Sequence, residues 1–281
     1  MPKNPLSSPP SVLPLIGLRA GEGEPFSSLY SSIFPSFTQI DKGSGRKQFS
    51  MEGLWAEWAE GNHHSPLNAS LVFRYVPPDP DQGERLWNTL AESGKILIPR
   101  EGNRQGEGWI RDPWGLVWQL CPKEEGEESS LVPVLQFNGK SFGQAAAAMD
   151  LYEDVLGRGI WEKLIRYPPQ AIDSPAGEIY YAQYRFGSSQ IGFMNRNQPP
   201  GGDFIPSLSM VIRCRNQSEI DYYWDRLSHL GKELKGGWLA DPYGFHWQII
   251  PQNLESLLPA EEITTRLGEM NKIQWSRLLE G

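Results

Sequence analysis

Two apolar stretches near the end of the chain carry polar side chains at alternating positions. His246 and Gln248 flank Trp247, and alternate residues of an extended strand point to the same face, so the imidazole and the amide share one face. A second set shares a face of the preceding strand-like stretch: Ser207, Ser209 and Arg213. Imidazole can exchange a proton near neutral pH, and amides and hydroxyls both donate and accept hydrogen bonds. These residue types predict a polar, mostly uncharged binding cavity.

The first half of the chain contains counterparts of these residues: Asn68, Ser70, Arg74 and Gln119. Gln136 lies on the face of Val132 and Val134 in another expected strand, and we assign it to the same cavity as His246 and Gln248. Arg213 could clamp an anion, or reach solvent from the end of its strand. His246 could act as an acid or base, or be a hydrogen-bonded core residue. Both alternatives stay open on the sequence.

The other histidines and the two cysteines offer no further catalytic group. His63 and His64 are adjacent, so they point apart on a strand and do not chelate together easily; a loop before a strand suits them. His229 falls near the end of an expected helix, where solvent exposure is the ordinary outcome. Cys121 and Cys214 fit neither a metal nor a disulfide framework and indicate reduced thiols. Neither G-x-S-x-G, a Walker loop nor a glycine-rich S-adenosylmethionine turn is present.

A long motif occurs twice and establishes a tandem duplication. The string G-W-x-x-D-P-[aromatic]-G-x-x-W-Q-x-x-P spans residues 108–122 and returns at 237–251, with a constant offset of 129 positions. Its Asp-Pro-x-Gly segments predict turns, so Asp112 and Asp241 are structural rather than catalytic. Its tryptophans are expected to pack helices against sheets: Trp109, Trp118, Trp238 and Trp247.

Length and charge limit the class of protein. The chain has 281 residues, enough for two domains, and a net charge of −8, which disfavours nucleic acid and anionic membranes as partners. The N-terminal residues fit neither a signal peptide nor a membrane span. With the reduced thiols, this predicts a cytoplasmic protein.

Each copy of the repeat shows the same order of expected elements: strand, helix, then two or three strands, all repeated once. In the second copy these are 132–137, 144–155, 178–186 and 190–195, followed by 207–214, 218–230, 235–240 and 245–250. We therefore expect two domains, 12–122 and 131–252, joined by a charged linker over 123–130 and followed by a C-terminal helical tail, 253–281.

This organisation resembles the vicinal-oxygen-chelate superfamily of glyoxalases, bleomycin-resistance proteins and dioxygenases, and in particular its PhnB-like (3-demethylubiquinone-9 3-methyltransferase-like) branch. The resemblance rests on 135–139, 221–227, 237–251 and the tail. It implies an α+β fold of tandem vicinal-oxygen-chelate domains, each built of two βαβββ modules forming a curved mixed sheet with helices outside. Members usually dimerise as single domains, so it also implies a pseudo-dimer within this chain, and leaves a homodimer open.

The resemblance also locates where catalytic members hold a divalent ion. Those positions fall at Gln248 and Gln119 on the last strands, at Ser207 and Asn68 on the middle strands, and at Val132 and Leu13 on the opening strands. None offers a carboxylate or an imidazole, so we expect no metal and no other cofactor.

Three functions remain on the sequence. The one we favour is a metal-free small-molecule-binding protein, with ligand contacts from Gln136, Ser207, Ser209, Arg213, His246, Gln248, Asn68 and Gln119. The alternative is a metal-dependent lyase, isomerase or dioxygenase with His246 as acid or base. The third is a scaffold whose cavities no longer bind anything.

Overall fold

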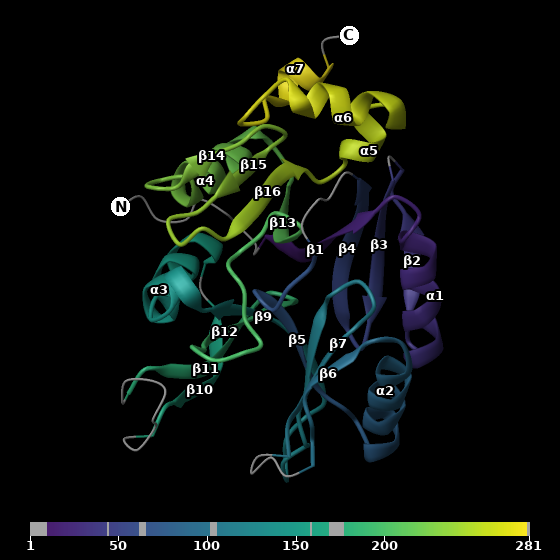
Figure 1. Cartoon of the computed structure of the whole chain (residues 1–281). Helices are drawn as coiled ribbons and strands as arrows, with labels where there is room; N and C mark the ends of the chain where they lie inside the picture. The colour runs from purple at the N-terminus through teal and green to yellow at the C-terminus, as the bar shows by residue number, and fades with distance from the viewer. Residues whose placement is uncertain are drawn as a thin grey trace.

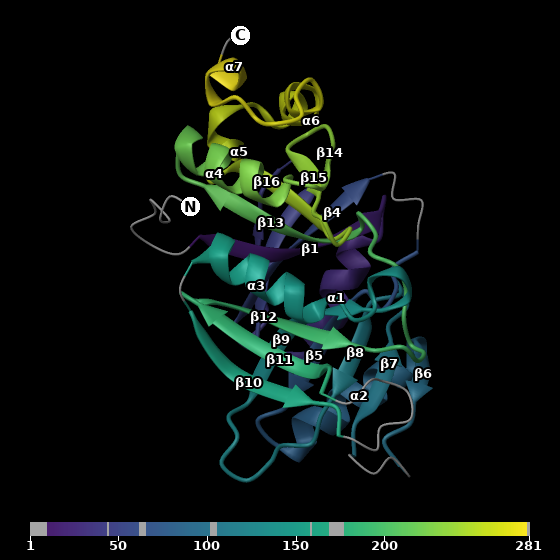
Figure 2. The same cartoon turned by 90° about the vertical axis from the view of Figure 1, so that its left-hand side faces the viewer.

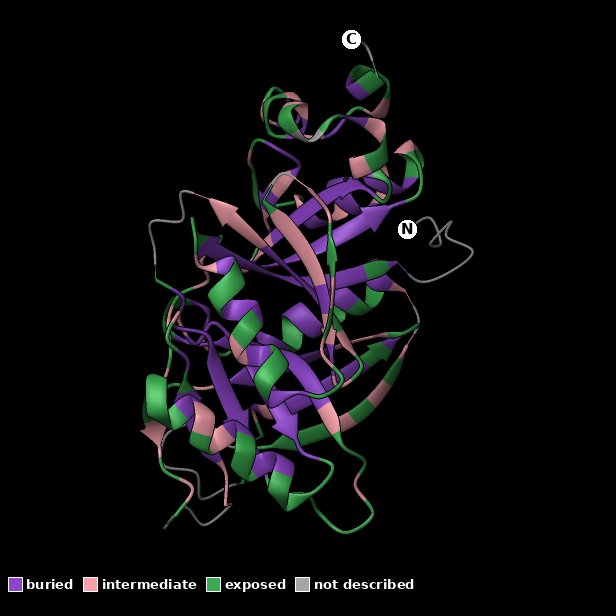
Figure 3. Cartoon of the chain, turned by 90° about the vertical axis from the view of Figure 1, so that its right-hand side faces the viewer, coloured by how far each residue is buried: buried purple, intermediate pink, exposed green. Residues whose placement is uncertain are grey.

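A computed structural model describes residues 10–43, 45–61, 66–101, 106–157, 159–168 and 177–279. In it two curved, mixed sheets of eight strands each are accompanied by helices on one face (Figure 1), which confirms the predicted α+β fold class. The sheets are called A and B below. Figure 3 shows buried strands in the middle of both sheets, and exposed residues on several outer strands and on the helices.

Sheet A has the strand order β14-β15-β16-β13-β1-β4-β3-β2. Its strands are β1 (Ser11–Arg19), β2 (Thr38–Asp41), β3 (Arg46–Met51), β4 (Leu54–Gly61), β13 (Leu208–Cys214), β14 (Lys232–Glu233), β15 (Trp238–Ala240) and β16 (His246–Pro251).

Sheet B has the order β10-β11-β12-β9-β5-β8-β7-β6. Its strands are β5 (Leu71–Val76), β6 (Lys95–Ile98), β7 (Gly108–Arg111), β8 (Val117–Leu120), β9 (Ser130–Phe137), β10 (Ile160–Arg166), β11 (Ile179–Phe186) and β12 (Ser189–Asn195).

Each sheet contains two βαβββ modules, as the resemblance implies, and these two modules come from different repeats. Sheet A joins the first module of repeat one to the second module of repeat two, through antiparallel pairing of β1 with β13. Sheet B joins the two remaining modules through antiparallel pairing of β5 with β9 (Figure 2). The two repeats are therefore intertwined, and every inner sheet face is built from both of them.

Helices α1 (Gly23–Ile33), α2 (Pro80–Ser93), α3 (Ala145–Leu156) and α4 (Gln217–Leu227) lie on the faces of the sheets that point away from these inner faces. The short η1 (Gly139–Ser141) precedes α3, and α5 (Leu254–Leu257), α6 (Ala260–Gly268) and α7 (Trp275–Leu279) follow β16. Asp79 caps α2 by accepting a hydrogen bond from the backbone N of Gln82 at 2.8 Å. Of the helices that the structure describes, none is long and apolar enough to cross a membrane.

The two Asp-Pro-x-Gly turns tie each repeat together on the helix side. Asp112 accepts the hydroxyl of Tyr30 on α1 at 2.7 Å and three backbone N–H groups of its own turn. Asp241 accepts the hydroxyl of Tyr152 on α3 and the indole N–H of Trp247. These contacts support the structural role predicted for both aspartates.

The C-terminal residues fold over the end of sheet A next to β15. The backbone N–H of Gly236 donates to the carbonyl of Met270 at 2.7 Å, and that of Gly237 to Asn271 at 3.0 Å. Gly237 has φ +75°, a conformation that glycine adopts without strain. Ile273 is fully buried there, so the tail is part of the core.

Candidate functional site

A network of buried charges occupies the inner face of sheet A. Glu57 of β4 is fully buried, and its Oε1 accepts a hydrogen bond from Nε of Arg213 on β13 at 2.6 Å. Its Oε2 lies 3.4 Å from Nη1 of Arg46 on β3. Nη2 of Arg46 donates to Oε1 of Gln248 on β16 at 2.6 Å. The network therefore joins strands that come from the first and the last module of the chain.

Glu255 on α5 completes this network from the C-terminal side. Its carboxylate oxygens lie 2.8 Å from Nη2 and 3.2 Å from Nη1 of Arg213. Nη1 also donates to the backbone carbonyl of Gln252 at 3.3 Å. Arg213 is only 5% exposed, so it does not reach solvent from its strand end. The guanidinium of Arg213, which we expected to clamp an anion, is already bonded to the protein's own carboxylates.

The charges in the network balance, with two guanidinium groups facing two carboxylates. Burial alone would lower the pKa of Arg213, but Glu57 and Glu255 raise it above the usual arginine value. Burial lowers the pKa of Arg46, an effect that Glu57 opposes and the neighbouring Arg213 reinforces. Arginine has so high an ordinary pKa that both side chains stay charged at neutral pH.

Three other predicted residues lie on the same inner face or at its edge. Ser207 and Ser209 are buried beside β1, and His246 is half-buried at the start of β16. Burial, with a smaller effect of Lys232, lowers the pKa of His246, so its imidazole is neutral at physiological pH. Ser209 Oγ and His246 Nδ1 are buried without a hydrogen-bond partner among the described residues. Both can still bond to a water or a ligand.

The remaining predicted residues lie in or beside sheet B, which corrects the assignment of Gln136 to one cavity with His246 and Gln248. Gln136 donates from Nε2 to the carbonyl of Pro200 at 2.7 Å, and Asn68 from Nδ2 to that of Asp203 at 3.0 Å. These two side chains hold the loop that leads to β13. Gln119 donates to Glu107 at 2.9 Å. The single cavity was wrong because modules of one repeat do not share a sheet.

Apolar side chains cover the inner face of sheet B. They are Ala69, Val72, Trp109, Val117, Val132, Val134, Tyr181 and Met194. Arg74 stacks on this cluster, with its guanidinium carbon 4.6 Å from the ring centre of Tyr181. Arg74 is the strand neighbour of Gln119, whereas Val211 rather than Arg213 is the neighbour of Gln248. The two arginines thus have different surroundings despite their similar sequence context.

The four motif tryptophans divide between the two faces. Trp118 and Trp247 lie in the large core on the helix side, which confirms their predicted packing role. Trp109 and Trp238 are the strand partners of Gln119 and Gln248 and therefore share the inner faces. For these two the predicted helix packing is wrong, because each precedes its turn on a strand whose alternation places it opposite the helices.

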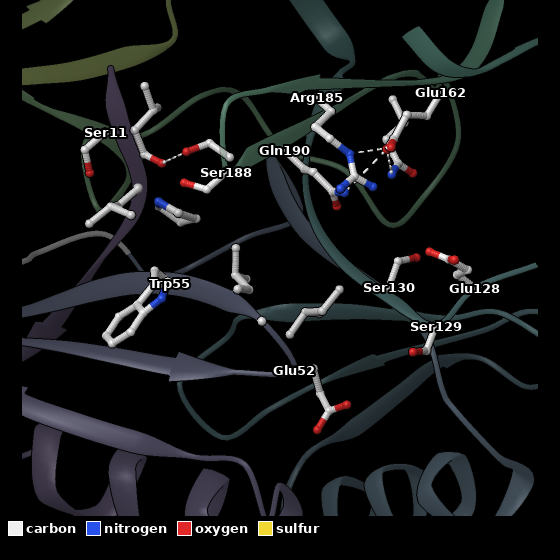
Figure 4. A pocket seen from close by; sticks show the side chains of 18 of the residues that line it. Ser11, Glu52, Trp55, Glu128, Ser129, Ser130, Glu162, Arg185, Ser188 and Gln190 are labelled. Carbon is white, nitrogen blue, oxygen red and sulfur yellow. Dashed lines mark hydrogen bonds and ion pairs between the residues drawn. The ribbon is translucent and has the colours of Figure 1, made fainter. Parts of the chain in front are cut away.

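A cavity of about 590 Å³ opens between the two sheets (Figure 4). Its walls come from the start of β1, the hairpin that joins β3 to β4, the linker residues 127–131, and the strands β10 to β12. Ser11 and Gln48 in the wall are the strand partners of Arg213 and Glu57. The cavity therefore adjoins the buried charge network, and both repeats contribute to it.

Arg46, Glu57 and Glu255 were not among the residues predicted from the sequence. Glu57 alternates with Trp58 in a strand-like stretch, so its placement on an inner face was accessible from the pattern. Its partner Arg213 was not, because it is 156 positions away and reaches Glu57 only through module exchange. The same holds for the contact of Arg46 with Gln248, which spans 202 positions. His63 and His64 lie outside the described residues.

Several solved structures are similar to this chain. Glyoxalase I from Zea mays matches with 13% identity over 91% of this chain and 96% of its own, with a TM-score of 0.53. A PhnB protein from Bacillus cereus is 23% identical over 42% of this chain and 95% of its own, with a TM-score of 0.37. A glyoxalase/bleomycin resistance protein/dioxygenase family enzyme from Burkholderia phytofirmans is 9% identical over 38% and 95%, with a TM-score of 0.31.

The fold thus defines a protein of the glyoxalase/bleomycin-resistance/dioxygenase superfamily. The family model described as 3-demethylubiquinone-9 3-methyltransferase matches residues 29–121 and 129–250, and the chain belongs to that family. No curated protein matches the chain. The resemblance drawn from the repeated motif is confirmed.

The residues at the inner face of sheet A do not suit the divalent ion that catalytic members of the superfamily hold. Glu57 is the one carboxylate there on a central strand, and the Gln248 oxygen already accepts from Arg46. A dication would have to share the space with two guanidinium charges, which repel it. Nor do the described residues of the chain contain any group of three His, Cys, Asp or Glu side chains placed to hold a metal.

Proposed function

We propose that this protein binds a small organic molecule without the aid of a metal ion. The cavity between the two sheets carries the proposal: its volume of about 590 Å³ is in the range of ligand sites, and serine, glutamine and glutamate side chains line it. The guanidinium of Arg46 supports the metal-free part, because it lies at Gln248 and Glu57, where a positive ion would otherwise bind.

The side chains on the inner face of sheet A do not suit a Lewis-acidic metal ion, so they do not support lyase, isomerase or dioxygenase chemistry of that kind. The role of His246 as acid or base stays a prediction.

A cytoplasmic location is part of the proposal and rests on Cys121 and Cys214, which are both free and buried, as suits a reducing compartment. We also propose that repeats 12–122 and 131–252 act as a pseudo-dimer within one chain.

The proposal is tested by protein NMR with a mixed set of cationic, neutral and anionic aromatic fragments. Trp55 lies in the cavity wall and is 41% exposed, so its indole N–H signal reports occupancy. Comparison with the Trp55→Phe variant assigns that signal among the eleven tryptophans. We expect at least one fragment to shift the Trp55 signal saturably while the buried tryptophans stay unchanged. If no fragment of the set shifts the Trp55 indole signal, the proposal is contradicted.

A further inference from the structure

We infer that the cavity between the sheets selects a small organic cation that carries a flat apolar group. This inference rests on the proposed function and adds a ligand class to it. The two sheets share this half-open cavity, and its wall offers both charged and apolar side chains to a ligand (Figure 4).

The charged residues of the wall leave an excess of negative charge. Among the described residues of the wall, these are Glu52, Glu127, Glu128, Glu162, Lys163 and Arg185, with a net charge of −2. Lys163 pairs with Glu127, and Arg185 pairs with Glu162, so both cations are neutralised inside the wall. Glu162 also accepts from Gln183 at 2.7 Å.

Two carboxylates of the wall lack a positively charged partner. Glu52 accepts a hydrogen bond only from the hydroxyl of Ser36, at 2.8 Å, and Glu128 is exposed. Among the residues that the structure describes, neither has a cation nearby to which it is paired. A positively charged ligand group would supply the missing partner, and a cavity wall between two protein layers strengthens that attraction relative to open solvent.

An exposed apolar part of the wall comes from β2 and β4 of sheet A. Ile40 is 47% and Trp55 is 41% exposed, so both offer apolar surface to the cavity. A tryptophan ring presents a flat surface that favours both apolar contact and cations. Figure 4 shows Trp55 and Glu128 on opposite sides of the same space. A ligand with an aromatic ring and a nearby ammonium or guanidinium group matches this arrangement.

An organic anion fits this cavity poorly. It would approach four carboxylates, while Lys163 and Arg185, the two cations among the described wall residues, are engaged by Glu127 and Glu162. A neutral polar molecule could bond to Gln48, Gln190 and the serines, but would leave Glu52 and Glu128 unused. Charge selectivity is therefore the property that separates this inference from the proposed function.

The test uses three probes that share a ring and differ in charge: benzyltrimethylammonium, benzyl alcohol and benzenesulfonate. Each is titrated into the full-length protein while the Trp55 indole signal is followed. We expect benzyltrimethylammonium to bind at least about tenfold more tightly than benzenesulfonate, because two unpaired carboxylates favour one ion and oppose the other. Added salt should reduce this difference.

Two variants and a control make the result specific. Glu128→Gln should weaken the binding of benzyltrimethylammonium about threefold, and the double variant Glu52→Gln with Glu128→Gln about tenfold. Neither variant should change the binding of benzyl alcohol. Glu92→Gln, at an exposed glutamate of α2 outside the cavity wall, should change nothing. Equal binding of the three probes, or of the cation to all variants, would overturn the ligand class and leave the proposed function standing. If no probe shifts the Trp55 indole signal, the proposed function of the cavity is itself contradicted.

Discussion

Two guanidinium groups share a single fully buried carboxylate at the inner face of sheet A. Glu57 bonds to Arg213 and faces Arg46. Its side chain has no exposed surface, so water cannot replace either partner. Removing one partner of such a pair leaves the remaining charges buried without compensation, which costs far more than the pair itself contributes. The network is therefore a sensitive point of the fold as well as a barrier to metal binding.

We expect Glu57→Gln to lower the free energy of unfolding by about 3 kcal/mol, because both arginines lose their shared counter-charge. Urea denaturation followed by circular dichroism measures the change. Glu24→Gln is the matched control: Glu24 also pairs with a cation, Lys47, but its side chain is 74% exposed, so the expected loss is below about 1 kcal/mol. Equal losses in the two variants would contradict the role given to the buried network.

The aspartates of the two turns should make the stability depend on pH. Burial raises the pKa of Asp112 to about 7 and that of Asp241 to about 6, although their hydrogen bonds oppose the shift. In the unfolded chain both titrate near about 3.9, so between about pH 4 and pH 7 the folded state holds more protons. The free energy of unfolding should therefore fall as the pH rises through this window.

The variant with Asp112→Asn and Asp241→Asn tests this pH dependence, because an amide accepts the same backbone hydrogen bonds without titrating. Urea denaturation at several pH values between 4 and 7 should give a flatter curve for the variant than for the unmodified protein. A variant that keeps the full slope would show that other groups cause it.

At the scale of elements, several buried side chains hold the C-terminal tail, and Ile273 is the most deeply buried of those described. Ile273 follows α6 and is fully buried next to Gly237, whereas Leu279 at the end of α7 is 58% exposed. Ile273→Ala should lower the free energy of unfolding by about 3 kcal/mol, and Leu279→Ala by less than about 0.5 kcal/mol. Thermal unfolding of both variants measures the difference; equal midpoints would show that the tail is not part of the core.

Local elements could be predicted from the sequence because their causes are local. Asp79 caps its helix through a bond to a residue three positions on, and the Asp-Pro-x-Gly turns need only their own residues. Alternation alone placed His246 and Gln248 on one face. The pairing of β1 with β13 could not be predicted, because nothing in the pattern of one module states which other module continues its sheet.

At the scale of the whole molecule, module exchange makes each repeat depend on the other. Pairing of β1 with β13 and of β5 with β9 runs through the middle of each sheet, not along its edge. The linker between the repeats should therefore be dispensable for holding the folded chain together. This also explains why Gln136 does not share a cavity with His246 and Gln248 as predicted: residues within one repeat line two different inner faces.

A protease site inserted between Lys123 and Glu124, both exposed, tests this dependence. After cleavage the two fragments should elute together in size-exclusion chromatography as one particle of the original size, and should separate only in denaturant. Two separate native peaks would mean that each repeat holds its own sheet.

Elemental analysis of the protein, purified without chelators from cells supplied with zinc, nickel, iron and manganese, tests the central claim most directly: that Arg46 takes the place of a metal ion at Gln248 and Glu57. We expect the content of all four metals to be far below one equivalent per chain. One equivalent of any of them, retained by the unmodified protein and lost in Glu57→Gln, would contradict it.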